Sequence, residues 1–212
     1  MPSKILVTGG LGYIGSHTSV ELIQQGHDIV IVDDLSNSSD DVLKGIKNIT
    51  GTAPEFLQFD LRNKEKVFEI FDLHPDIEGI IHFAASKAVG ESVSDPLSYY
   101  ENNLGSLIHL LQVVEKNKKT CSFIFSSSCT VYGQADTLPI GEEAPIKQAA
   151  SPYGNTKQVG ENILKDNTHS NPLLRVISLR YFNPIGSHPS NEIGELPKGK
   201  PQNLVPFITQ TG

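Results

Sequence analysis

Six short apolar runs separated by amphipathic segments constrain the fold of this chain more than any other feature. The runs are KILVT (4–8), DIVIVD (28–33), EFLQFD (55–60), GIIHFAA (79–85), SFIFSSS (122–128) and LRVISLR (174–180). Helix-like segments lie between them at residues 13–25, 63–73, 97–117 and 152–166. Strands that alternate with helices form parallel βαβ units. The sequence therefore predicts an α/β fold with a doubly wound parallel sheet.

A glycine-rich loop follows the first run, in which TGGLGYIG places Gly9, Gly12 and Gly15 at a turn and at the start of a helix. Glycines let the backbone approach a pyrophosphate, which the free N–H groups and the positive helix end then hold. Asp33 ends the second run, where a carboxylate can accept hydrogen bonds from the adenosine ribose and would repel a 2′-phosphate. These features favour a Rossmann-like NAD site over an NADP site. The alternative is a plain glycine turn with a capping aspartate.

Further candidate site residues lie at or just after the ends of the third, fourth and fifth runs. Asp60 ends the third run, Phe83 and Ala84 end the fourth, and Lys87 comes just after it. The carboxyl ends of the strands line the ligand crevice of a doubly wound sheet, so we expect these residues near a cofactor. The serines at 126–128 close the fifth run at the same edge. Taken singly, a strand-end cap, a solvated lysine and a polar loop are the alternatives.

The segment SPYGNTK (151–157) predicts the start of a helix, because Ser151 suits an N-cap and Pro152 suits the first helical position. Tyr153 and Lys157 then leave the same face, one turn apart. A lysine held there would lower the pKa of the phenol and make the tyrosine a usable general base. The alternative is that both side chains only face water.

Composition narrows the classes of partner. The 212 residues carry a net charge of −7, which argues against nucleic-acid and membrane-surface partners. No apolar run approaches the length of a membrane span, and the chain enters its first strand without a signal region. Cys121 and Cys129 are too few for a disulfide framework and lack metal-ligand spacing. A cytoplasmic protein without a metal site is expected.

Taken together, these features resemble the extended short-chain dehydrogenase/reductase superfamily and, in its nucleotide-sugar-modifying branch, the UDP-glucose 4-epimerase family. The resemblance covers essentially the whole chain. The segments that carry it are VTGGLGYIGSHT (7–18), HFAASKAVGES (82–92), NN (102–103), FSSSCTVYG (125–133), SPYGNTK (151–157) and LRYFNPIGSHPS (179–190).

The resemblance implies interconversion of UDP-glucose and UDP-galactose through a transient 4-keto sugar, with tightly bound NAD taking and returning a hydride. Tyr153 would take the proton of the C4 hydroxyl with help from Ser128, and Lys157 would bridge the nicotinamide ribose. The implied cofactor-binding residues are Gly9, Gly12, Tyr13, Ile14, Gly15, Asp33, Asp60, Leu61, Phe83, Ala84, Lys87, Asn102, Tyr153, Lys157 and Phe182. The implied substrate-binding residues are Ser128, Tyr153, Asn183, Asn203 and Leu204.

The resemblance also implies two parts, an NAD-binding domain at 1–182 and the beginning of a smaller substrate-binding lobe at 183–212. Family members continue well beyond Gly212, so we expect a truncated chain that forms a homodimer when complete. The lobe segment would then lack packing partners. Its apolar residues, expected to be exposed, are Ile193, Leu196, Leu204, Val205, Phe207 and Ile208.

Other functions are weighed against this one. A nucleotide-sugar 4,6-dehydratase needs an Asp-Glu pair after the central serine, whereas Ser128 is followed by Cys129, Thr130 and Val131. A UDP-uronate 4-epimerase is a second alternative, because the missing lobe would determine the specificity at sugar C5. A non-catalytic NAD-binding module also stays open, although it would not need Ser128, Tyr153 and Lys157 together.

Overall fold

The computed structural model describes residues 2–198 and 203–211. Its strands are β1 (Lys4–Thr8), β2 (Asp28–Asp33), β3 (Glu55–Gln58), β4 (Ile77–His82), β5 (Cys121–Ser128) and β6 (Leu174–Tyr181). They pair in parallel in the order β3-β2-β1-β4-β5-β6. This confirms the doubly wound α/β fold. The order reverses between β1 and β4, which places the ligand crevice of such a sheet beyond these two strands.

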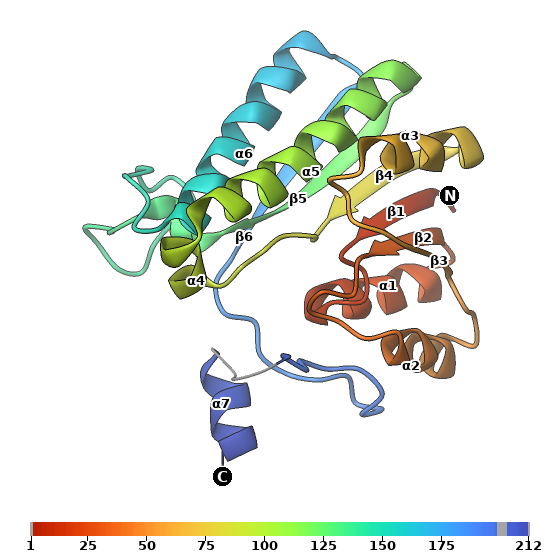
Figure 1. Ribbon diagram of the computed structural model, residues 1–212, viewed down its shortest axis with the longest axis horizontal. Helices are drawn as coiled ribbons and strands as arrows, with labels where there is room; N and C mark the ends of the chain where they lie inside the picture. Colours follow the sequence, from red (N-terminus) through yellow and green to blue (C-terminus); the bar gives the residue numbers. More distant parts are fainter. Residues whose placement is uncertain (1, 199–202, 212) are drawn as a thin grey trace.

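The helices cover both faces of the sheet (Figure 1). Those of the described residues are α1 (Tyr13–Gln24), α2 (Asp41–Thr50), α3 (Lys64–Leu73), α4 (Val89–Ser94), α5 (Pro96–Asn117), α6 (Pro152–Ser170) and α7 (Leu204–Thr211), with a 3₁₀ turn, η1, at Cys129–Tyr132. α3, α5 and α6 lie on one face, and α1 and α2 lie on the other. None of these helices combines the length and apolar character that crossing a bilayer requires.

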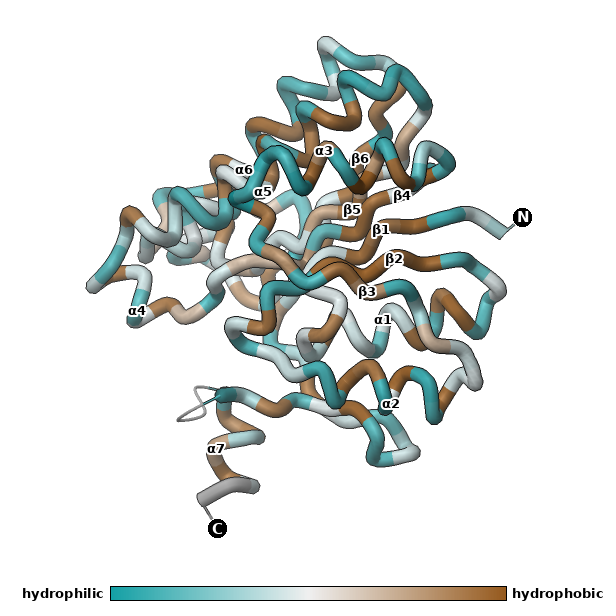
Figure 2. Tube along the Cα trace, turned by 45° about the vertical axis from the view of Figure 1, so that its right-hand side comes forward, coloured by the Kyte–Doolittle hydropathy of each residue, from teal (hydrophilic) through white to brown (hydrophobic). Residues whose placement is uncertain are grey.

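The central strands β1, β2 and β4 are buried on both faces and are apolar almost throughout (Figure 2), whereas the edge strand β6 leaves Ile177 and Leu179 exposed. Successive residues alternate between two cores, as the period of a strand requires. Leu6 and Val30 pack under α3 and α5, whereas Val7 and Ile31 pack under α1 and α2. This two-sided burial explains why the sequence shows continuous apolar runs, which are typical of parallel sheets.

Two strands end earlier than the apolar runs suggested. β3 ends at Gln58, so Asp60 lies beyond it, and β4 ends at His82, so Phe83 and Ala84 lie beyond it. The N–H groups of Phe83 and Ala84 both donate to the Thr8 carbonyl, at 3.0 and 3.1 Å, which turns the chain out of the ladder. The residues still lie at the carboxyl edge of the sheet, in loops rather than in strands.

Sequence reasoning missed α2, although Val42, Ile46 and Ile49 recur at helical spacing there. The helix also contains a glycine, Gly45. The structure gives Gly45 a reason, because a Cβ at this position would lie 2.6 Å from the Glu192 carbonyl oxygen. The glycine therefore lets the C-terminal segment pack directly on α2.

The expectation that Ile193 is exposed is wrong. Its side chain is 3% exposed and belongs to the core under α1 and α2. Tyr13 donates to the Gly186 carbonyl at 2.6 Å, and Asn48 donates to Glu192 at 3.0 Å. Residues 183–198 thus run from β6 across to α1 and α2 (Figure 1). The exposure expected for the other apolar residues of this segment is confirmed at Leu196, Leu204, Val205, Phe207 and Ile208.

Candidate active site

The glycine loop joins β1 to α1 in a turn that admits no side chain at two positions. Gly9 has φ +66°, and a Cβ on it would lie 2.6 Å from the Ala84 nitrogen. A Cβ on Gly15 would lie 2.2 Å from the Gly9 carbonyl oxygen. The loop, the start of α1 and the chain beyond β4 are therefore packed backbone against backbone.

The N-terminus of α1 is free to hold an anion. Gly12 is its N-cap and supplies no side-chain hydrogen bond, and the first turn, which includes Tyr13 and Ile14, contains no acidic residue. The N–H groups of this turn, together with the positive end of the helix, suit a pyrophosphate. Tyr13 is engaged elsewhere, because its hydroxyl donates to the Gly186 carbonyl.

Asp33 lies buried at the end of β2 with its carboxylate beside the glycine loop. One oxygen accepts from the Leu11 N–H at 3.1 Å, and the other accepts from the Leu35 N–H at 3.0 Å and the Ser38 hydroxyl at 2.7 Å. An ionised carboxylate can accept about four hydrogen bonds. Three are made within the protein, so one acceptor position is left for a ligand hydroxyl.

Asp60 is held by Arg62, a residue to which sequence reasoning gave no role. The Arg62 backbone N–H donates at 2.8 Å, and its guanidinium donates to the carboxylate at 2.8 and 2.6 Å. These hydrogen bonds hold the pKa of Asp60 below its ordinary value. Leu61 between them is buried. The pair lies in an Asp-Leu-Arg segment, which is the signal that could have revealed it.

The loop after β4 is tied to the helices by a buried asparagine that sequence reasoning quoted without a role. Asn103 accepts from the Ser86 N–H at 2.8 Å and donates to the Thr156 hydroxyl at 3.1 Å. Its neighbour Asn102 donates to the Ser86 hydroxyl at 3.1 Å. A buried asparagine in an apolar helix face is the signal, because it must find partners. The loop is thereby fixed to α6 beside Lys157.

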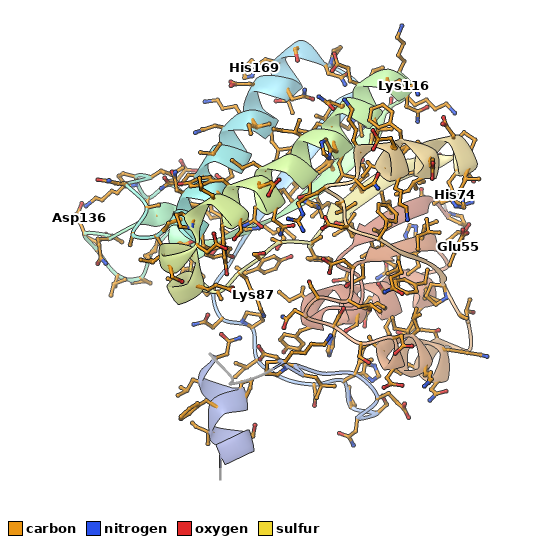
Figure 3. The ribbon with its side chains drawn as sticks, viewed as in Figure 1. Glu55, His74, Lys87, Lys116, Asp136 and His169 are labelled. Carbon is orange, nitrogen blue, oxygen red and sulfur yellow. The ribbon has the colours of Figure 1, made fainter. Side chains whose placement is uncertain are left out.

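Lys87 and the C-terminal segment face each other across the carboxyl edge of the sheet (Figure 3). The Lys87 ammonium lies 4.0 Å from a Glu195 carboxylate oxygen, which also accepts from the Asn203 amide at 2.5 Å. The predicted cofactor residue Lys87 and the predicted substrate residue Asn203 thus share a partner. Leu204, Phe182 and Asn183 are exposed, and the last two lie just beyond β6.

The predicted catalytic residues meet where β5 ends and α6 begins. Ser151 caps α6 as expected, since its hydroxyl accepts from the Gly154 N–H at 3.1 Å. Lys157 is only 4% exposed, and its ammonium donates to the Ser126 carbonyl at 2.8 Å, 5.8 Å from the centre of the Tyr153 ring. Burial lowers the pKa of Lys157 to about 8. The Ser128 hydroxyl accepts from the Thr130 N–H at 3.2 Å and interacts with the Tyr153 phenol.

The expected depression of the Tyr153 pKa by Lys157 is not what the structure shows. Burial of the phenol raises the pKa of Tyr153, and the hydrogen bond with Ser128 opposes that rise only in part. The Lys157 ammonium is directed at the Ser126 carbonyl instead. Ser128 is therefore the residue that stabilises the phenolate in this arrangement.

Away from this edge the described residues offer little chemistry. No group of three His, Cys, Asp or Glu side chains among them could hold a metal ion. Glu55 and His74 pair at 3.1 Å at the other end of the strands (Figure 3). Cys121 is buried and Cys129 is partly exposed, both as free thiols. The predicted site residues described above lie at the carboxyl edge of the sheet.

A glycine loop at the switch point of a parallel sheet, with serine, tyrosine and lysine converging from β5 and α6, defines a protein of the extended short-chain dehydrogenase/reductase class. Residues 5–206 match the NAD dependent epimerase/dehydratase family, and the chain belongs to that family.

Curated relatives are similar along nearly the whole chain. UDP-glucose 4-epimerase of Dictyostelium discoideum is 50% identical over 208 residues, which are 98% of this chain and 60% of that protein. The Bacillus subtilis UDP-glucose 4-epimerase is also 50% identical, over 97% of this chain and 60% of its own length. The structure of the Bifidobacterium longum UDP-glucose 4-epimerase with NAD⁺ and UDP has a TM-score of 0.94 at 43% identity, over 98% of this chain and 62% of that one. This chain spans about 60% of the length of these curated relatives.

Proposed function

We propose that the protein holds NAD at the carboxyl edge of its sheet and interconverts UDP-glucose and UDP-galactose at sugar C4. The observation that carries this proposal is the convergence of Ser128, Tyr153 and Lys157 beside the chain that packs on the glycine loop. The names of the relatives support the same reaction.

The residues of the first half fit a dinucleotide. Gly9, Gly12 and Gly15 leave the backbone free to approach a pyrophosphate, and α1 presents uncapped N–H groups to it. Asp33 would accept from the adenosine ribose with its remaining acceptor position. Lys157 would hold the nicotinamide ribose. The other residues of the predicted cofactor set surround these at the same edge, and their roles belong to this proposal.

The chain's own residues would handle the proton. With its phenol deprotonated, Tyr153 would take the proton of the C4 hydroxyl, while Ser128 holds that hydroxyl and stabilises the phenolate. NAD, when bound, supplies a reversible acceptor for the C4 hydride. Tyr153 would then return its proton to the C4 oxygen of the inverted sugar. Asn183, Asn203 and Leu204 would contact the nucleotide sugar from the C-terminal segment.

The proposal also covers the domain organisation and the oligomeric state of the protein. Residues 1–182 would form the NAD-binding domain, and residues 183–212 would begin the substrate-binding lobe. The protein would be a cytoplasmic homodimer. Its net charge of −7 argues against a nucleic-acid or membrane-surface partner. Light scattering of the purified protein measures the oligomeric state.

A coupled assay tests the reaction. The purified protein is incubated with NAD and UDP-galactose, and UDP-glucose is measured with a UDP-glucose-specific dehydrogenase. Formation of UDP-glucose supports the proposal. Conversion of UDP-glucuronate in place of UDP-galactose would make the protein a UDP-uronate 4-epimerase. Tight NAD binding without conversion of either sugar would make it a non-catalytic module.

The Asp33→Asn variant is expected to lose preference for NAD over NADP. The amide keeps the shape of the side chain but removes the charge that repels a 2′-phosphate. Hydrogen bonds to a charged group contribute about 1.5–3 kcal/mol, so the ratio of the two dissociation constants should change about tenfold or more. Titration calorimetry with both dinucleotides measures it.

The matched control is Asp34→Asn, because Asp34 is the exposed neighbour whose carboxylate accepts from Ser36 at 2.8 Å. It loses the same charge and should keep the preference for NAD. Equal changes in both variants, or an unmodified protein that binds NADP as tightly as NAD, would contradict this role of Asp33.

A further inference from the structure

The Lys157 ammonium lies over an aromatic ring that sequence reasoning left without a role. Its nitrogen is 5.0 Å from the centre of the Phe125 ring. Lys157 is on α6 and Phe125 is on β5, and their exposed fractions are 4% and 2%. A cation over the face of a ring within about 6 Å is attracted by the ring quadrupole, most strongly where water is excluded.

A glycine in α6 lets this ring come so close to the helix. A Cβ on Gly160 would lie 2.8 Å from Cζ and 3.2 Å from Cε1 of Phe125. Gly160 is one turn beyond Lys157, so the ring occupies the space that a side chain at 160 would fill. Any larger residue there would displace the ring from beneath the ammonium.

On the neighbouring strand β4, His82 stacks on the same ring, with centroids 6.1 Å apart and planes at 23°. One of its ring nitrogens lies 2.7 Å from the Thr8 hydroxyl, and the side chain is 2% exposed. Burial, with a smaller contribution from the charge of Lys157, lowers the pKa of His82 to about 3. His82 is thus neutral at physiological pH and places no second cation near Lys157.

Three elements supply the polar groups that face the ammonium. Tyr153 comes from its own helix, His82 from β4, and the Ser126 carbonyl from β5. An ammonium has three donors, and one is used on Ser126. On a second side, the Phe125 ring attracts the ammonium through a cation–π contact, which needs no hydrogen bond. One direction then remains for a ligand hydroxyl.

We propose that Phe125, seated against Gly160 and stacked on His82, is the positioning residue that holds the Lys157 ammonium in place for the cofactor ribose. The inference rests on the role given to Lys157 in the proposed function. It adds that an aromatic ring supports this lysine. The ring can take its position because Gly160 has no side chain.

The test compares Phe125→Leu with Phe123→Leu. Both residues lie on β5 two positions apart, both are buried, and both rings lie against His82. The two variants should therefore lose similar thermal stability. Only the first removes the ring beneath Lys157, so it alone should lower the titration midpoint of that lysine, by about one pH unit. NMR of ¹³Cε-labelled lysine reports the midpoint in the protein without ligand, with the signal assigned by Lys157→Arg.

Gly160→Ala is the second variant, in case Phe125→Leu does not fold. Alanine is favoured in helices, so this change pushes the ring without weakening α6 itself. It should lower the Lys157 midpoint in the same direction. Its control is Gly105→Ala in α5, where a Cβ would meet no atom within 4 Å.

NAD affinity is the second measurement. Phe125→Leu and Gly160→Ala should weaken NAD binding about tenfold, and the two controls should not. A Lys157 midpoint that is unchanged, or that moves equally in Phe123→Leu, overturns the role of Phe125. A wild-type protein that binds no NAD overturns the proposed function instead, and the titration of Lys157 still decides the positioning.

Discussion

Replacing Tyr153 with phenylalanine is expected to reduce turnover about 10²–10⁴-fold while leaving NAD bound, because the variant loses only the phenol oxygen that exchanges the proton. Burial raises the pKa of Tyr153, so the unmodified protein should gain rate with rising pH as the phenolate forms. The residual rate of the variant should lack that rise. Initial rates of UDP-galactose conversion across the neutral to alkaline range measure both effects.

Tyr100→Phe is the matched control. Its hydroxyl accepts from the Asn155 amide at 2.7 Å, so this variant also removes a phenol that contacts the first turns of α6. It should retain nearly full turnover and the same pH dependence. A Tyr153→Phe protein with a near-normal rate would contradict the proposed role of the Tyr153 phenol in proton transfer.

Replacing Lys157 with methionine is expected to abolish turnover and yet to stabilise the fold near neutral pH. Burial lowers the pKa of Lys157 from 10.5 to about 8, and that difference corresponds to roughly 3 kcal/mol for burying the charge. Loss of the hydrogen bond to Ser126 offsets about 1 kcal/mol of the gain. A rise of about 1–2 kcal/mol in the free energy of unfolding should therefore appear in urea titrations at neutral pH.

The contribution of Lys157 to the free energy of unfolding should change with pH in one direction. Between pH 8 and 10.5 the folded protein has released the Lys157 proton while the unfolded chain still holds it. Stability rises with pH wherever the unfolded state binds more protons. The contribution of Lys157 should therefore rise across this window and be absent from Lys157→Met.

Lys165→Met makes the same change on the exposed side of α6 and should keep the rise of the unmodified protein. Two results would contradict the claim that the buried Lys157 charge destabilises the fold. The first is a Lys157→Met protein that is less stable than the original at neutral pH, and the second is one whose stability still rises fully above pH 8.

The sequence by itself determined the features that depend on neighbours along the chain. The alternation of apolar runs and helical segments predicts the sheet, because buried strands and amphipathic helices have different hydrophobic patterns along the chain. The glycine loop and the cap at Ser151 are likewise local, since they depend on backbone freedom and on a hydroxyl three residues away. The placement of Tyr153 and Lys157 on one face follows from the helical repeat. Their catalytic roles stay predictions.

Only the tertiary structure decided what surrounds those residues. Asn103 ties the loop after β4 to α6, Ile193 is buried against α2, and Phe125 lies beneath Lys157. The direction of the Tyr153 pKa also reverses the expectation, because burial outweighs its polar neighbours. Most of these findings have the same physical reason. Burial and charge environment are set by segments far apart in the chain, such as β5 against α6, and no local period of the sequence records which atoms those segments bring together.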